Sequence, residues 1–309
     1  MKKTNKPLIS VIMPVYNAGN FLVEAIESIL NQEYKNFELI VINDNSNDNS
    51  GEVIESYRNK YPRKIKYIKL PKRLGAFGAA NIGLQYAQGE FIAPMDSDDV
   101  SHPQRFDKEV NYLIENKEII VVGSQAKLID KNGLVIGQKV FPLHHKDIYR
   151  SFFEVQPIVH PSCMIRKSLL PSKNKLYLNK YKVNDDYYTL FSLFKYGKFA
   201  NLSEFLFNYR IHANNSSLQK IKQKFFNTVK IRIEAVSKFG YRPSFIGFLK
   251  FLLQILIITP MPEKMVFYCF LIIKGIITPK ELLSKVTRHA YLFYSKTKKY
   301  SYSFLRLFV

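Results

Sequence analysis

The sequence predicts an α/β fold built around a parallel sheet, and three observations support this prediction. The first hundred residues alternate short runs rich in β-branched residues with apolar residues at helical spacing, which is typical of βαβ units. Polar clusters follow directly after three of the predicted strands. Of the 309 residues, 47% are hydrophobic and 23% are charged, as in a globular protein with a sizeable core.

The predicted elements follow one another along the first hundred residues. Residues 8–13 form a β-branched strand that we expect Pro14 to end, and helical spacing begins at Phe21 behind Asn20 as a candidate cap. The later elements are predicted as a strand at 37–42, a polar turn at 43–51, a helix to about residue 61, a strand at 64–70, a helix around 79–87 and a strand at 91–95.

The pattern is less regular in the second part of the chain. We expect a helix from near Pro103, a strand at 119–122, a hairpin at 130–133 and a basic helix at about 218–239. Residues 241–309 then become aromatic, aliphatic and cationic, with eleven Lys and Arg against two acids.

Charge and cysteine content exclude some classes of protein. The formal net charge of +21 predicts an anionic partner, which composition leaves open as nucleic acid, acidic lipid or a phosphate-bearing substrate. Cys163 and Cys269 lie far apart with no CxxC spacing, which argues against a zinc site or a disulfide framework. The chain has neither GxxxxGK[ST] nor a GxGxxG after a strand, so a P-loop NTPase and a dinucleotide dehydrogenase lose support.

Three polar clusters lie where an open α/β sheet binds its ligands, at the carboxyl ends of strands. They are residues 14–17, 43–46 and 96–99. Turn and cap chemistry would explain any one of them alone. Asp96, Asp98 and Asp99, however, place three carboxylates within four residues, and their repulsion calls for a cation. Hard oxygen ligands suit Mg²⁺ or Mn²⁺, with a diphosphate substrate as the complement.

The chain resembles family two of the inverting nucleotide-sugar glycosyltransferases, which have the GT-A fold, and among them the bacterial surface-polysaccharide type. The matching segments run in the family's order from the first strand to near Ser217. They are ISVIMPVYN, AIESILNQ, FELIVINDNSND, GAANIGLQYAQGEFIAPMDSDDVSHPQRF, VVGS, HPSCMIRKSLL, NDDYY and NLSEFLFNYRIH.

The resemblance implies donor-binding roles for residues that follow the first two strands or lie near the third helix. By their place in the family's motifs, these are Pro14, Tyr16, Asn17, Asp44, Arg73 and Asn81. Asp44 falls where an acid hydrogen-bonds the base, commonly uracil, whose imino N–H a carboxylate can accept. Arg73 could support the base or a phosphate.

The resemblance also implies a metal site. Asp96 and Asp98 match the DxD element, in which the first acid approaches the ribose or the metal and the second is the firmer metal ligand. Asp99 is interpreted as a helix-capping acid ahead of Pro103. His212, which follows Arg210 in a motif near the end of the catalytic domain, is a candidate ligand of the metal or the diphosphate.

Asp186 is the predicted general base, because it matches the second acid of the family's Glu-Asp pair at the start of a helix. Such a carboxylate takes the proton of the acceptor hydroxyl. The sequence departs from the usual pattern at Asp185, Tyr188 and Ser192, where the family often has Glu, an acid and Arg. His160 lies in a segment that frames the acceptor site in the family.

These inferences predict a GT-A domain at residues 1–217, a mixed sheet flanked by helices, followed by a helical extension at 218–309. The predicted activity is metal-dependent transfer of a sugar, with Mn²⁺ or Mg²⁺, from a UDP-linked donor to a hydroxyl of a glycan or lipid-linked acceptor in polysaccharide biosynthesis. The sequence leaves three alternative functions open. They are a sugar-nucleotide pyrophosphorylase, a basic nucleic-acid-binding protein and a catalytically silent relative.

Residues 241–309 are predicted to dock on an anionic membrane surface. Two apolar runs, 245–258 and 265–277, are each shorter than the roughly 20 residues of a spanning helix, so interfacial helices fit better. Packing on the catalytic domain, a dimer interface and a re-entrant or spanning hairpin are the alternatives. We expect a cytoplasmic protein, peripheral on the inner face of the cell membrane, without a signal peptide and with no specific nucleic-acid partner; an oligomer is left open.

Overall fold

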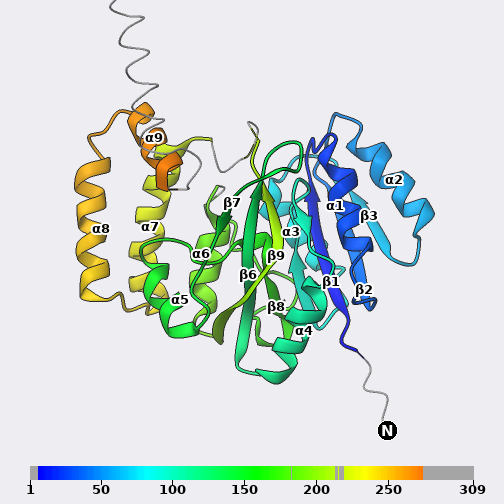
Figure 1. Ribbon diagram of the computed structural model, residues 1–309, viewed down its shortest axis with the longest axis horizontal. Helices are drawn as coiled ribbons and strands as arrows, with labels where there is room; N and C mark the ends of the chain where they lie inside the picture. Colours follow the sequence, from blue (N-terminus) through cyan, green and yellow to red (C-terminus); the bar gives the residue numbers. More distant parts are fainter. Residues whose placement is uncertain (1–5, 182, 213–214, 216–218, 274–309) are drawn as a thin grey trace, which may run out of the picture. The chain divides into compact units, whose positions relative to one another are not determined.

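The computed structural model describes residues 6–181, 183–212, 215 and 219–273. These residues divide into two compact units, with the boundary between Leu256 and Ile257. The first unit holds the sheet and the helices around it (Figure 1). The part of the predicted basic extension at 274–309 lies outside the described residues.

A nine-stranded mixed sheet forms the centre of the first unit, with strands in the order β3-β2-β1-β4-β8-β6-β9-β5 and β7 paired with β6. Its strands are β1 (Ile9–Val15), β2 (Phe37–Asn43), β3 (Ile65–Lys69), β4 (Phe91–Pro94), β5 (Val100–Ser101), β6 (Ile119–Ile129), β7 (Val135–Lys139), β8 (Met164–Arg166) and β9 (Lys198–Arg210). Strands β1 to β4 are parallel, β8 runs antiparallel to β4 and β6, and β9 is parallel to β6. The predicted mixed sheet is therefore confirmed.

Helices cover both faces of this sheet (Figure 1). On these faces lie α1 (Phe21–Leu30), α2 (Ser50–Lys60), α3 (Ala76–Leu84), α4 (Arg105–Glu115), α5 (His145–Phe152) and α6 (Asp185–Leu193). Helices α7 (Ile221–Phe239), α8 (Phe245–Ile258) and α9 (Glu263–Ile273) follow in the chain, with α9 in the second unit. None of the helices within the described ranges combines the length and the apolar character needed to cross a membrane.

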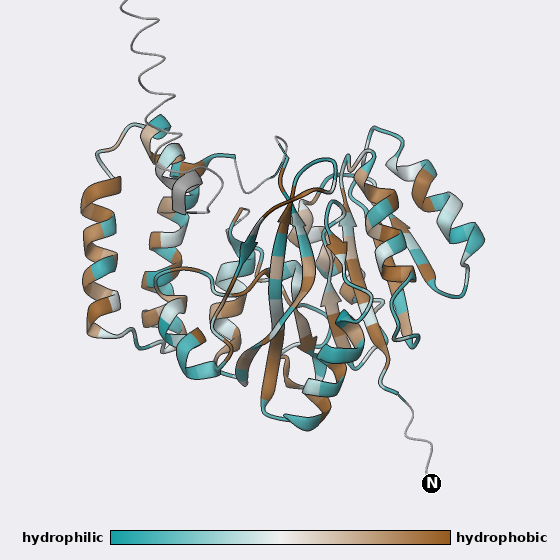
Figure 2. Ribbon diagram, viewed as in Figure 1, coloured by the Kyte–Doolittle hydropathy of each residue, from teal (hydrophilic) through white to brown (hydrophobic). Residues whose placement is uncertain are grey.

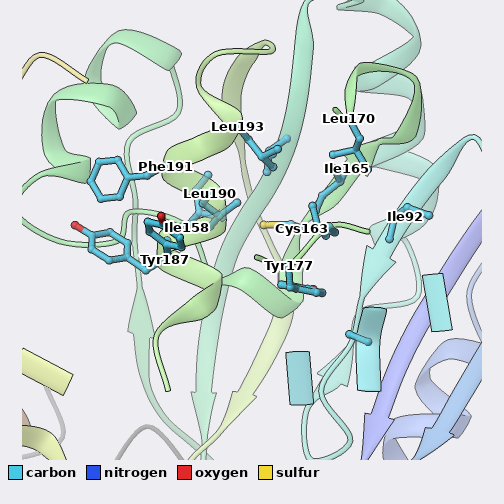
Figure 3. Close-up of a cluster of buried hydrophobic side chains, with 14 of the residues drawn as sticks. Ile92, Ile158, Cys163, Ile165, Leu170, Tyr177, Tyr187, Leu190, Phe191 and Leu193 are labelled. Atoms are coloured by element: carbon cyan, nitrogen blue, oxygen red, sulfur yellow. The ribbon is translucent and has the colours of Figure 1, made fainter. Parts of the chain in front are cut away.

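Two apolar clusters lie on opposite faces of the sheet, as the alternation of side chains along each strand requires. Leu39 and Val41 join the cluster that α1, α2 and α4 cover, whereas Ile40 and Ile42 join the cluster of α3, α5 and α6. Figure 3 shows part of the second cluster, which includes Leu190 of α6 together with Cys163 and Ile165 at the start of β8. Both faces of the central strands are buried, so β1, β2 and β4 are apolar along nearly their whole length.

The expectation that Pro14 ends the first strand was wrong. Pro14 lies inside β1 and pairs with Ile42 of β2. On its other side β1 pairs with β4 only as far as Ile12. Pro14 has no N–H to continue the ladder toward β4, which ends with the bond from Met95 N–H to the carbonyl of Ile12 at 3.0 Å, while the pairing with β2 continues past it.

Several other boundaries also differ from the predictions. The sixth strand extends to Ile129 rather than 122, because β9 pairs with it along this length. Asn20 precedes α1 but makes no side-chain cap. The predicted hairpin at 130–133 is confirmed between β6 and β7, where Gly133 has a φ of +85° that glycine adopts without strain.

Helix α7 and one stripe of α8 pack against the rest of the first unit, to which they belong. The buried Arg232 guanidinium donates to the carbonyl of Glu154, and to Gln254 Oε1 at 2.7 Å. Tyr241 is buried and stacks on Tyr149 with ring centres 4.4 Å apart, while Phe251 meets Phe153 at 5.2 Å. Residues up to Phe251 thus contribute to the hydrophobic core.

An ion pair inside the core gives a prediction about stability. Arg105 and Glu109 have fully buried side chains, with Nε and Oε2 3.2 Å apart, and Arg105 also donates to the carbonyl of Cys163. We expect Glu109→Ala to lower the free energy of unfolding by about 3–5 kcal/mol in urea titrations, because it leaves a buried charge without its partner. Glu55→Ala, which removes an exposed partner of Arg58, should cost less than about 1 kcal/mol. Equal losses would contradict this account.

Candidate active site

The polar segments predicted to carry chemistry follow β1, β2 and β4 at one edge of the sheet. Because these strands are parallel neighbours, their carboxyl ends lie together. The loops after β1 and β2 are joined directly. Asn17, with a φ of +50°, accepts a bond from the N–H of Asn47 at 3.0 Å and donates its own N–H to Ser46 Oγ at 3.1 Å. The N–H of Gly19 donates to Asp48 Oδ2 at 3.1 Å.

Asp44 fixes the segment that leads into α3. Its buried carboxylate accepts the N–H groups of Leu74 and Gly75 at 2.6 and 2.8 Å. This brings Arg73 over the ring of Tyr16, with its guanidinium carbon 3.6 Å from the ring centre. Tyr16 is 37% exposed, so the two side chains form a flat surface beside Asp44 that a planar ring could stack upon.

The Asn81 side chain lies within α3 and holds a distant loop. Its Nδ2 donates to the carbonyl of Tyr177 at 2.8 Å, and its Oδ1 accepts the N–H groups of Leu176 and Tyr177 at 3.1 and 3.0 Å. The amide is thus largely occupied by backbone groups. A direct contact between Asn81 and a nucleotide stays a prediction, as do the contacts of Pro14, which is half-buried in β1.

Asp96, Asp98 and Asp99 come together after β4, with one carboxylate oxygen of each within 4.8 Å of the others. Asp96 is open to solvent, yet desolvation by the surrounding protein, and then the charges of Asp98 and Asp186, raise its pKa to about 7. Burial, and then the charges of Asp98 and Asp96, raise the pKa of Asp99 well above its ordinary value. The three groups repel one another as they stand.

The interpretation of Asp99 as a helix cap was wrong. Helix α4 starts later, behind Gln104, without a side-chain cap. Asp99 is buried, and its Oδ1 accepts the N–H of Arg210 in β9 at 2.8 Å. The pairing of β5 with β9 brings this distant strand to the acids.

Arg210 and His212 reach the acids from β9 in different ways. The buried Arg210 guanidinium donates to the carbonyls of Asp98 and Asp130 at 2.8 and 3.2 Å and pairs with Glu24 of α1, so it braces the backbone of the acidic loop. His212 Nε2 lies 2.8 Å from Asp98 Oδ2. The motif at 209–212 therefore places its histidine beside the second acid of the DxD element.

The acidic group fits a divalent cation. Its donors are hard carboxylate oxygens, which Mg²⁺ and Mn²⁺ prefer. Asp99 Oδ2 is buried without a hydrogen-bond partner among the described residues. A cation here would relieve both the repulsion and this unmet acceptor.

The two acids at the start of α6 have separate surroundings. Asp185 is fully buried and accepts the N–H groups of residues 179, 180 and 181 at 2.6, 2.7 and 3.1 Å. Asp186 is half-buried and accepts one bond, from Gln156 Nε2 at 3.3 Å. It also lies near enough to Asp96 for its charge to raise the pKa of that group. Asp185 thus holds the loop, and Asp186 is available to a ligand.

Tyr177 and Gln156 also lie at the site, although the sequence did not predict a role for either of them. The buried Tyr177 hydroxyl lies 3.0 Å from His160 Nε2. Burial lowers the pKa of His160, while the charge of Asp186 opposes this shift. Because the charge of Asp186 acts on His160, the pair of Tyr177 and His160 lies close to the predicted base. Neither residue stands in a recognisable motif, and only the fold brings them to the site.

Comparisons with known proteins agree with this geometry. A family model described as "Glycosyl transferase family 2" matches residues 10–171. An uncharacterized glycosyltransferase of Haemophilus influenzae is 34% identical over 256 residues, which cover 75% of this chain and 79% of that protein. Another, from Methanocaldococcus jannaschii, is 34% identical over 224 residues, covering 71% and 76%.

Two solved structures share the fold. Residues 1–349 of S. aureus TarS, in complex with UDP-GlcNAc, superpose with a TM-score of 0.63 at 21% identity, covering 76% of this chain and 68% of that one. The mannosyltransferase PcManGT from Pyrobaculum calidifontis, in complex with GDP-Man and Mn²⁺, gives a TM-score of 0.62 at 15% identity, covering 94% and 81%. At these identities the likeness concerns the arrangement of strands and helices.

Proposed function

Because the chain belongs to glycosyl transferase family 2, we propose that it transfers a sugar from a UDP-linked donor to a hydroxyl group of a glycan or lipid-linked acceptor, with inversion at the anomeric carbon. Family membership and the GT-A fold make it a nucleotide-sugar glycosyltransferase, which removes the pyrophosphorylase and nucleic-acid alternatives. The observation that supports the finer proposal most strongly is that Asp186 accepts one hydrogen bond, from Gln156, whereas Asp185 accepts three from backbone N–H groups. Asp186 therefore has acceptor positions left for the hydroxyl of a sugar acceptor.

Asp186 acts as the general base in this proposal. Its carboxylate lies in the first turn of α6 and is half-buried. It accepts the proton of the acceptor hydroxyl as that oxygen forms a bond to the anomeric carbon. The bond between this carbon and the diphosphate oxygen breaks on the opposite side, so the configuration inverts. Gln156 is then a positioning residue that orients the carboxylate.

The loops after β1 and β2 form the donor site. We place the base on the surface formed by Tyr16 and Arg73, next to Asp44. Asp44 uses one bond on each oxygen to hold the N–H groups of Leu74 and Gly75. A carboxylate offers about four acceptor positions, which leaves capacity for the imino N–H of uracil. Asn17 borders this site, and Asn81 supports it through the loop at 176–177.

Asp96 and Asp98, with His212 beside them, are the residues that would hold Mn²⁺ or Mg²⁺. When bound, such a cation would balance the negative charge of the donor's diphosphate. Arg210 keeps the acidic loop in place through two backbone carbonyls and Glu24. Polysaccharide biosynthesis is the proposed setting.

A donor screen tests this proposal. UDP-, dTDP- and GDP-sugars are incubated with the protein and Mn²⁺, Mg²⁺ or EDTA, and binding and slow donor hydrolysis are measured. We expect saturable binding and hydrolysis of a UDP-sugar that EDTA abolishes. A preference for GDP-sugars would overturn the assignment of the base, and full activity in EDTA would overturn the metal role of the acidic group.

A further inference from the structure

Helix α8 exposes a long apolar face. Of its residues, only Gly247 and Phe251 are buried, on the side that packs against the rest of the first unit. The opposite face carries large apolar side chains that are exposed to solvent, from Phe245 at 76% to Leu256 at 73%. The others on this face are Ile246, Phe248, Leu249, Leu252 and Leu253. Figure 2 shows the hydrophobic colour along most of α8.

The composition of α8 explains why this face needs a cover. Lys250 is its only charged residue, and it pairs with Glu154 of the same unit at 2.8 Å. A helix that is apolar on all sides is normally buried in protein or in lipid. At 14 residues, α8 is about 21 Å long, which is too short for the roughly 30 Å hydrocarbon core of a bilayer.

A basic hollow adjoins the N-terminal end of this face. It has a volume of about 440 Å³ and is lined by α5 and by the residues directly before α8. Lys146, Arg150 and Arg242 line it, and none of them forms an ion pair in the described part of the chain. Asp147 is the neighbouring acid on α5.

The floor of this hollow is held firmly. Tyr149 stacks on the buried Tyr241, and its hydroxyl accepts the N–H of Arg242 at 2.9 Å. Ser244 Oγ accepts the N–H of Gly247 at 3.1 Å. Lys146, Arg150 and Arg242 therefore line a surface whose backbone is held by hydrogen bonds and ring stacking.

We propose that the exposed face of α8 and the hollow together dock the protein on a membrane of anionic lipids. The apolar side chains lie at the boundary between head groups and acyl chains, and Lys146, Arg150 and Arg242 take the phosphate of a lipid head group. A second copy fits less well, because the adjoining Lys146, Arg150 and Arg242 would be brought toward the same cations of the other copy, and α8 has no acidic residue to balance them. This surface is separate from the catalytic edge, so the proposal does not depend on the donor or the base.

Vesicle sedimentation with the full chain tests the docking surface. Substitution variants are preferred to a shortened chain, because Tyr241 and Phe251 belong to the core. We expect wild type to bind phosphatidylglycerol vesicles at low salt, to bind less in high salt and to bind phosphatidylcholine weakly. The triple variant Phe245→Ser/Leu249→Ser/Leu253→Ser should lose binding to both. Its matched control replaces exposed apolar residues elsewhere, as Ile114→Ser/Leu134→Ser/Val140→Ser, and should bind like wild type.

A second set of variants tests the contribution of the three cations of the hollow to vesicle binding. Lys146→Glu/Arg150→Glu/Arg242→Glu should weaken binding to the anionic vesicles by on the order of 10²-fold, since each of the three cations near an acidic surface contributes roughly a factor of five. The control replaces exposed cations elsewhere, as Arg63→Glu/Lys117→Glu/Lys131→Glu. Circular dichroism and UDP binding confirm that each variant is folded.

Three results would overturn the proposal. The first is equal vesicle binding by wild type and both triple variants of the docking surface. The second is a dimer in light scattering that the Phe245→Ser/Leu249→Ser/Leu253→Ser variant loses, in the absence of vesicle binding, which would assign the face to a second copy. The third is binding of inorganic phosphate in the hollow without vesicle binding, which would assign it to a soluble anion.

Discussion

Asp98→Ala is expected to abolish metal-dependent binding of the donor while the protein still folds. The substitution removes one of three carboxylates that lie within 4.8 Å of one another, and it also removes the partner of His212 Nε2. Groups that only orient a metal ligand already contribute 10–100-fold to affinity, so loss of a ligand should cost more than about 10²-fold. Titration of Mn²⁺ and of a UDP-sugar by calorimetry measures this loss.

A remote acid serves as the control for this variant. Asp107→Ala removes a partly exposed carboxylate on α4 that accepts a bond from Asn111 Nδ2 at 3.1 Å and lies 3.9 Å from Lys6 Nζ. It should leave both titrations unchanged. The thermal midpoint of Asp98→Ala should stay near that of wild type, because its side chain is only partly buried. Full turnover with unchanged Mn²⁺ dependence would show that Asp98 is not a metal ligand.

Asp186→Asn is expected to lower transfer by roughly 10²–10⁴-fold, the usual contribution of general acid–base catalysis. The amide keeps the shape of the side chain but cannot take a proton at neutral pH. Within the described part of the chain, the Asp186 carboxylate accepts a hydrogen bond only from Gln156, so donor affinity should change little. Transfer is measured at saturating donor, and UDP affinity is measured separately.

Asp185→Asn is the matched comparison, because it makes the same chemical change one residue away. Asp185 accepts three backbone N–H groups in a buried site, so we expect a loss of about 1.5–3 kcal/mol in unfolding free energy. Equal transfer by wild type and Asp186→Asn would move the base elsewhere. A parallel loss of UDP affinity would instead indicate a role at the donor.

The alternation of apolar residues was enough to predict the parallel part of the sheet, but not its far side. Strands β1 to β4 are local βαβ units whose pattern is complete within the first hundred residues. Strand β9 pairs with both β6 and β5, about eighty and one hundred residues away in the chain. Such pairings leave no periodic signal at the strand itself, so the length of β6 and the role of Asp99 were predicted incorrectly.

The sequence by itself determined the fold class, the family and the residue types of the site. Strand ends and acid spacing placed Asp44, Asp96 and Asp98 at one edge, because parallel strands bring their carboxyl ends together whatever the rest of the chain does. The residue types could not separate Asp185 from Asp186, since both are carboxylates in one motif, and only the resemblance to the family favoured Asp186 as the base.

The tertiary structure decided which polar side chains of the site remain available to bind a ligand. Asp185 turns to three N–H groups of its own loop, Asn81 holds the loop at 176–177, and Arg210 braces backbone carbonyls. Burial also decided that α8 packs through Gly247 and Phe251 and leaves its other face exposed. Hydrogen bonds and packing depend on what lies opposite each side chain in space, and residue spacing along the chain carries no record of that.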